Sequence, residues 1–177
     1  MLTLRRRHER AGHDLYFRAV EAARTPWFYA ELGVPDTLDG RFDMVGLHAF
    51  LVIRRVQGLR PPGPALAQAV FDAMFSDMDM TLRELGVGDL GVGRRIKAMW
   101  EGFHGRSQAY QAALAADDAD ALAQALARNV WRDAGALLPA RRLAEAVMAQ
   151  DRHLAGFDLP AFARGEIAFG DVRPVPA

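Results

Sequence analysis

Apolar side chains recur every three or four positions between Pro64 and Leu85, and this spacing constrains the fold more than any other feature of the chain. A stripe with that period covers one face of an α-helix, so the segment is predicted to be a helix that buries the stripe. Gly86 follows, where a left-handed residue commonly closes a helix. The residues predicted to face inward are Phe71, Met74, Phe75, Met78, Leu82 and Leu85.

A second helical stripe begins at Val92, after the glycine-rich run GVGDLGVG at 86–93, and extends to Leu114. Glycine-rich runs of this kind favour a turn over a regular element. Two helices joined by a short loop commonly pack antiparallel, so the segment 64–114 is predicted to be a helical hairpin.

The polar side of this hairpin predicts a contact surface. Met80 lies on the outer face of the first helix, and an exposed methionine among carboxylates is typical of a docking surface. A solvated face with intrahelical ion pairs is the alternative interpretation. The residues predicted to contact a partner, here called the predicted partner surface, are Asp77, Met80, Glu84, Asp89 and Arg94.

The remainder of the chain is predicted to be helical, because no segment alternates with period two for long enough to form a strand. We expect an all-α fold: one compact bundle of about six helices over residues 1–155. The tail, 156–177, is predicted to be irregular and to pack on the bundle. The other predicted helices are 14–24, a short one from Pro26 that ends at Gly33, 42–56, 119–133 and one that begins at Pro139.

Composition limits the class of partner. The 22 basic residues balance 22 acidic ones, which argues against direct reading of nucleic acid, and the absence of cysteine excludes thiolate chemistry. The most apolar window, Met44–Ile53, is too short to cross a bilayer. We therefore expect a soluble cytoplasmic protein. Peripheral contact with the inner face of the cytoplasmic membrane stays open, because the basic segment 5–10 could touch a membrane surface.

Catalytic motifs are absent from the sequence, which contains no HExxH, GxSxG or GxxxxGK[ST] pattern. We therefore predict no catalytic residue, no metal site and no cofactor. The competing hypothesis is a small metal- or lipid-dependent enzyme that uses His48, although a satisfied core histidine is the commoner interpretation. A third hypothesis is a structural adaptor that self-associates through its first helix. The carboxylates considered with His48 are Asp39, Asp43 and the group Asp72, Asp77 and Asp79.

Three segments resemble the ubiquinol-cytochrome c chaperone family of cytochrome bc1 assembly factors. They are GVPDTLDGRFDMVGLHAFLVIRRV at 33–56, FDAMFSDMDMTLRELGVGDLGVGRRIKAMWEGFHGR at 71–106, and LARNVW at 126–131. The likeness covers nearly the entire chain. Mitochondrial members carry an additional amino-terminal region, so the chain looks like a compact bacterial member. His104 departs from the pattern, which has an aromatic residue such as tyrosine before Gly105 and Arg106.

The resemblance implies a non-enzymatic, all-helical protein that binds newly made cytochrome b and helps it enter the respiratory complex. It also implies a contact with the ribosome, because mitochondrial members act near the exit tunnel together with a small partner protein. Whether this chain has such a partner protein, and its oligomeric state, are left open.

Overall fold

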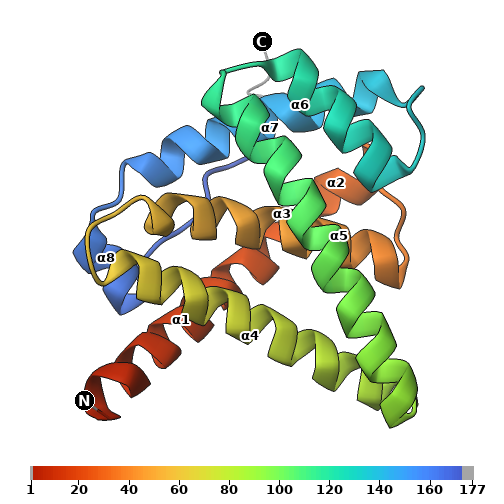
Figure 1. The fold of residues 1–177 in the computed structure, drawn as a ribbon. Helices are drawn as coiled ribbons and strands as arrows, with labels where there is room; N and C mark the ends of the chain where they lie inside the picture. Colours follow the sequence, from red (N-terminus) through yellow and green to blue (C-terminus); the bar gives the residue numbers. More distant parts are fainter. Residues whose placement is uncertain (1, 173–177) are drawn as a thin grey trace.

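The computed structural model describes residues 2–172, and the side chains of residues 6–172. Every regular element in this range is helical, which confirms the predicted fold class. Figure 1 shows the helices gathered into one bundle, with the chain running from red to blue. The elements are α1 (Leu2–Ala23), α2 (Pro26–Ala30), α3 (Leu38–Gln57), α4 (Gly63–Glu84), α5 (Asp89–Ala115), α6 (Ala119–Leu126), the π-helical turn η1 (Ala127–Trp131), α7 (Leu137–Ala155) and α8 (Leu159–Arg164).

Helix α3 is the centre of the bundle. Its residues are apolar around most of the circumference, and they meet α1 and α4 on one side and α7 on another. Leu51 and Val52 are adjacent in sequence, point in different directions from the helix, and are both fully buried. A helix buried on several faces is the central element of a soluble bundle, as the sequence predicted.

Helices α1 and α4 cross at very short range. A Cβ atom added to Gly12 would lie 2.4 Å from the Cβ of Ala69, so only glycine fits at the crossing. Helix α1 also begins well before Asp14, where the sequence placed its start. Ala11 and Gly12 are buried at the crossing with α4, whereas residues 6–10 are mostly exposed, as expected of a solvated extension of the helix.

Helix α5 is attached differently from the other long helices. Helix α4 closes at Gly86, whose φ of 80° confirms the predicted left-handed conformation. Helix α5 then diverges from α4 and crosses over α3 (Figure 1). The sequence predicted that the two helices pack antiparallel. In the structure they are joined at one end and splayed at the other, because α5 continues onto α6 instead of lying along α4.

The stripe predicted for α4 is buried only in part. Met74 and Met78 are buried, as is Leu82, but Leu85 is 59% exposed and both phenylalanines of the stripe, Phe71 and Phe75, are only half-buried. Divergence of α5 leaves Phe71 and Phe75 partly uncovered, whereas Leu85 is exposed because it lies at the tip, beside the connecting loop.

The carboxyl-terminal segment is more regular than the sequence suggested. Residues 159–164 form α8, and Phe162 and Ile167 are buried against the bundle. Gln150 fixes the following chain by two hydrogen bonds with the backbone of Gly170, at 2.7 and 2.8 Å. The described part of the tail therefore packs on the helices, whereas the proposed boundary at residue 155 stays a prediction and residues 173–177 lie outside the described range.

Candidate functional site

An open groove lies between α4 and α5, with α3 as its floor. It has a volume of about 690 Å³, and its apolar walls come from all three helices. Phe50 and Ile53 belong to α3, Phe71 to α4 and Phe103 to α5. We call this site the aromatic groove. In Figure 1, α5 crosses α3 at an angle, and the lining residues of the groove belong to these two helices and to α4.

Phe103 holds α5 on the body at the crossing. Its ring centroid lies 5.9 Å from that of Phe71 and 6.2 Å from that of Phe75, distances typical of interacting aromatic pairs. A Cβ atom at Gly46 would lie 3.6 Å from the Phe103 ring, an ordinary packing distance, so the ring lies directly against this part of α3. The crossing is therefore stabilised by aromatic packing on one wall of the groove.

The rim of the aromatic groove is polar and partly cationic. Arg54 forms an ion pair with Asp151, at 2.7 Å, while Arg55 donates a hydrogen bond to the carbonyl oxygen of Ala155, at 3.0 Å. On the opposite rim, His104 stacks on exposed Trp100 with the centroids 5.1 Å apart. The groove thus combines an apolar floor with hydrogen-bond donors at its edges. The remaining polar residues of its lining are Gln57, Ser107, Gln108 and Gln111.

The methionines of α4 lie where the helical period predicted them. Met74 and Met78 are 0% and 4% exposed and belong to the core, whereas Met80 is 54% exposed on the outer face of α4. The open apolar surface is lined with phenylalanine instead. The helical period identified the stripe, but it carried no signal for which part of the stripe α5 would leave uncovered.

The predicted partner surface lies toward the hairpin tip, away from the aromatic groove. Asp77 is half-buried and accepts a hydrogen bond from the Tyr16 hydroxyl, at 2.6 Å. Burial and this hydrogen bond raise the pKa of Tyr16. Met80 is exposed, as are Glu84, Asp89 and Arg94. Asp77 therefore has a structural role in joining α4 to α1, and the binding role of the five residues stays a prediction.

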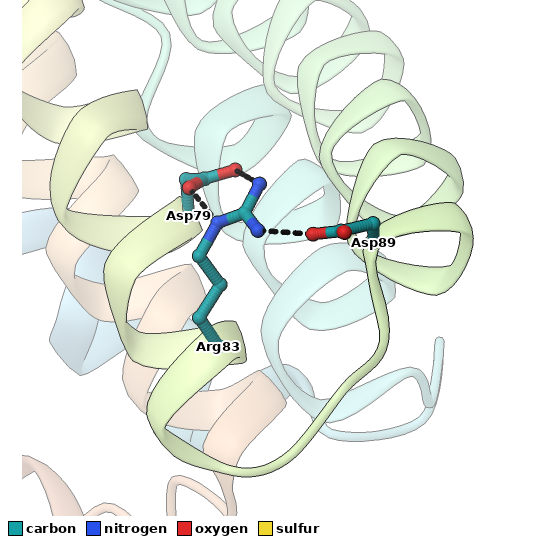
Figure 2. Close-up of polar contacts among 3 residues, drawn as sticks. All are labelled: Asp79, Arg83 and Asp89. Carbon is teal, nitrogen blue, oxygen red and sulfur yellow. Dashed lines mark hydrogen bonds and ion pairs between the residues drawn. The ribbon is translucent and has the colours of Figure 1, made fainter.

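Arg83 joins the two arms of the hairpin tip. Figure 2 shows its guanidinium between Asp79 on α4 and Asp89 at the first turn of α5. The ion pairs measure 2.6 Å to Asp79 and 2.5 Å to Asp89. Asp89 precedes the cations Arg94 and Arg95 in α5, but its ion pair is with Arg83 of α4. All three side chains are well exposed, so the cluster fixes the direction of α5 weakly.

A buried carboxylate fastens α5 and η1 to the central helix. Asp43 on α3 is 7% exposed and forms ion pairs with Arg106 on α5 and with Arg132, the latter at 3.0 Å. Arg132 reaches Asp43 from a left-handed backbone conformation, with φ of 56°, directly after the π-helical turn. Burial raises the pKa of the Asp43 carboxyl, and the guanidinium groups of Arg106 and Arg132 oppose that rise. The sequence showed Asp43 as a polar exception without indicating its partners.

His48 does not lie in a catalytic arrangement with the carboxylates considered beside it. It is 2% exposed, lies between the rings of Phe28 and Phe169, and its Nδ1 is 2.8 Å from the carbonyl oxygen of Met44. Burial lowers the pKa of His48 to about 4. Within residues 6–172, no cluster of three or more histidine and carboxylate side chains is arranged to hold a metal ion. His48 is therefore a satisfied core histidine, the commoner of the two interpretations.

Comparison with known proteins identifies the family. The profile of the family described as "Ubiquinol-cytochrome C chaperone" matches residues 30–169. This chain belongs to that family. The match includes α3, α4, α5 and the π-helical turn, and with them both walls and the floor of the aromatic groove. The resemblance seen in the sequence is thereby confirmed.

Two relatives place the chain within the family. It is 24% identical over 123 residues to ubiquinol-cytochrome-c reductase complex assembly factor 1 of Xenopus laevis, a match that covers 70% of this chain and 59% of the frog protein. The crystal structure of the Cbp3 homolog from Brucella abortus is similar over 94% of this chain and 92% of that one. The TM-score is 0.85 and the identity 42%. The bundle is thus the fold of a solved family member.

None of the helices within residues 2–172 has the length and apolar character needed to cross a bilayer.

Proposed function

We propose that this protein is a non-enzymatic chaperone that binds newly made cytochrome b and assists assembly of the cytochrome bc1 complex. Membership of the ubiquinol-cytochrome c chaperone family is the observation that carries the proposal. The frog relative is named as an assembly factor of ubiquinol-cytochrome-c reductase, which is the same complex. The role needs binding and release of a client, and no chemical step.

The aromatic groove supports this function physically. A newly made membrane protein exposes apolar helices, and in water these helices are stabilised when their apolar surface is covered. An open groove with apolar walls on two helices and a floor on a third is suited to one face of such a helix. Half-buried side chains such as Phe71 and Phe103 can cover the client without unfolding the chaperone, since the core beneath them is complete.

Affinity capture tests the proposal. Tagged full-length protein, expressed in cells that make the bc1 complex, should retain cytochrome b after mild solubilisation. The variant Phe103→Ala should retain several-fold less, because it removes one wall of the groove. Phe17→Ala is the matched control: Phe17 is 51% exposed on α1 and is not part of the groove lining, so its capture should equal that of wild type. Absence of cytochrome b from the wild-type capture would contradict the function.

A second experiment tests the predicted partner surface at the hairpin tip. Reversing the charge of Asp77 and of Glu84 together should reduce capture if these carboxylates contact a partner. Glu145→Lys is the matched control, because it reverses the charge of an exposed carboxylate on α7, outside the predicted partner surface. The melting temperature must be measured for each variant, because Asp77 also accepts the hydrogen bond of Tyr16. Unchanged capture by a folded double variant would remove Asp77 and Glu84 from the surface.

The same capture addresses the remaining predictions. Ribosomal proteins in the eluate would support action beside the ribosome, and recovery of the tagged protein from washed membranes would support a peripheral position at the membrane. Light scattering of the purified protein reports its oligomeric state, and with it the hypothesis of a self-associating adaptor.

A further inference from the structure

The aromatic groove is apolar along most of its floor and carries arginine side chains at one end. Its apolar floor runs along α3 and ends at Arg54 and Arg55, in the last turn of that helix. Arg54 is neutralised by Asp151. The hydrogen bond of Arg55, by contrast, goes to a neutral acceptor, the carbonyl oxygen of Ala155. The cationic charge of Arg55 therefore faces the groove end without a carboxylate ion pair within the described residues.

Three buried donor groups at this end have no hydrogen-bond partner within the described part of the protein. Among residues 6–172, the Nε atoms of Arg54 and Arg55 and the Oγ atom of Ser107 are buried without a partner, and all three residues line the groove. Buried polar groups in native proteins are almost always paired, so an unpaired set at one place needs an explanation. Ser107 lies on α5 and the arginines on α3, so the donors come from the floor of the groove and from one of its walls.

We infer that the aromatic groove binds an apolar helix that carries a carboxylate near one end, with the carboxylate at Arg55 and Ser107. The apolar face of the helix covers Phe71 and Phe103, and the carboxylate accepts hydrogen bonds from the donors of the groove end. Carboxylates suit such a site because they accept several hydrogen bonds and their charge complements guanidinium. This inference rests on the proposed function for the natural source of the helix.

An apolar helix fits the groove better than a compact ligand does. The groove is open between α4 and α5 instead of closed over its contents, and its four large apolar side chains come from three elements. Helices bound in grooves present anchors at successive turns to such a row of side chains. The charge at one end then fixes the direction in which the helix lies, because the reversed helix would leave the carboxylate over apolar walls.

Binding of a peptide pair to the full-length protein tests the inference. The probes are two fluorescein-labelled helical peptides of leucine and alanine, about 18 residues long, that differ only in glutamate or glutamine near the carboxyl end. Wild-type protein should bind the glutamate peptide about tenfold more tightly at low salt, since a charged acceptor makes the stronger hydrogen bonds. The preference should shrink in 1 M salt. Equal affinity for the two peptides would overturn the inference.

Variants assign the preference to the groove end. Arg55→Gln should abolish the preference while leaving the affinity for the glutamine peptide within about twofold, because its apolar contacts remain. Arg60→Gln is the matched control, since Arg60 is exposed in the following loop and lies outside the groove lining. Arg55→Lys retains the charge and should retain part of the preference, which keeps the test decisive if Arg55→Gln is unstable. A full preference in folded Arg55→Gln would overturn the inference.

Two further measurements separate this inference from the proposed function. Capture of cytochrome b by wild-type protein, without discrimination between the peptides, would leave the function intact and overturn the inference. Discrimination between the peptides without capture of cytochrome b would support the inference and contradict the proposed function. Sodium laurate that displaces neither peptide supports a helix as the occupant, whereas laurate binding in the absence of peptide binding would identify a fatty-acid site and overturn the inference.

Discussion

Helices α3 and α5 are both long, yet one is the core of the molecule and the other lies largely on its surface. Ten of the 20 residues of α3 are buried, compared with four of the 27 residues of α5. Between residues 93 and 109, α5 contains no buried residue. A helical period therefore identifies a helix without identifying its environment. The width of the apolar stripe, which nearly encircles α3 and is narrow on α5, carries that information.

The difference also separates stability from function. Helix α3 contributes buried apolar area on several sides, and that area is the main source of folding free energy. The buried residues of α5 lie near its two ends, Val92 beside the tip and Tyr110 and Leu114 near the carboxyl end. Between them, the Asp43–Arg106 ion pair and Phe103 hold the helix at the crossing. The apolar side chains of α5 that remain available to contact a partner are those that line the aromatic groove. Substitutions in the core around α3 should consequently affect mainly the free energy of unfolding, and substitutions on the groove face of α5 mainly the binding of a partner.

The largest expected effect comes from a pair of equivalent truncations. Phe28→Ala, at a side chain 1% exposed in the core, should lower the free energy of unfolding by about 3–5 kcal/mol. Phe103→Ala, at a half-buried groove position, should lower it by roughly 1–2 kcal/mol, because less area is lost and the site can collapse. Urea denaturation monitored by circular dichroism measures both values. Equal losses would contradict the division between core and groove.

Removal of the buried carboxylate should have the next largest effect. Asp43→Ala leaves Arg106 and Arg132 without their shared partner and should cost about 2–4 kcal/mol of unfolding free energy. Arg132→Gln, at a side chain 51% exposed, should cost less, because Arg106 still neutralises the carboxylate. Thermal unfolding of the two variants compares them directly. A larger loss in Arg132→Gln would show that Arg132, and not Asp43, is the important member.

The core should also respond to acid through His48. Burial lowers its pKa to about 4 in the folded state, from 6.5 when the chain is unfolded. The unfolded state binds more protons between these values, so the stability contribution is complete above pH 6.5 and falls as the pH drops toward 4. We expect wild type to lose about 2 kcal/mol between pH 7 and pH 5 from this residue.

The matched comparison for this prediction is His48→Gln, which cannot titrate in the window. Both proteins share the opposite contribution of Asp43, whose raised pKa favours folding at lower pH, so the difference between their pH profiles isolates His48. Parallel profiles would show that the histidine is protonated without cost in the folded state.

The smallest expected effect is at the hairpin tip. Arg83→Gln removes the ion pairs to Asp79 and Asp89, but all three side chains are exposed and surface pairs contribute little. We expect no resolvable change in melting temperature at physiological salt. A clear destabilisation would mean that the tip, and not only the crossing at Phe103, fixes the direction of α5.

Parts of the fold could be predicted from local pattern because the pattern and the packing agree. The apolar line at helical spacing in α6 and η1, formed by Leu122, Leu126 and Val130, is fully buried. Leu143 and Leu154 of α7, which follow the same spacing, are buried as well. Neighbouring helices cover these short stripes completely, so the helical period is enough to indicate which residues face inward.

The candidate site was harder to predict because it depends on gaps between helices. Phe71 was predicted as part of a buried stripe, yet it lines an open groove. Asp77 was predicted to be exposed, yet it is tied to Tyr16, which lies 61 positions earlier. Neither relationship has a local signature, since each depends on how two helices cross.

The sequence by itself determined that the chain is all helical, where most of the helices lie, and which family it belongs to, because residue period and long ordered motifs are local properties. Only the tertiary structure decided that α5 diverges from α4, that Asp43 joins Arg106 and Arg132, and that phenylalanines instead of methionines line the groove. The physical reason is that exposure depends on which distant helix covers a side chain. In this protein the crossing of α5 over α3 determines which side chains near the groove are covered.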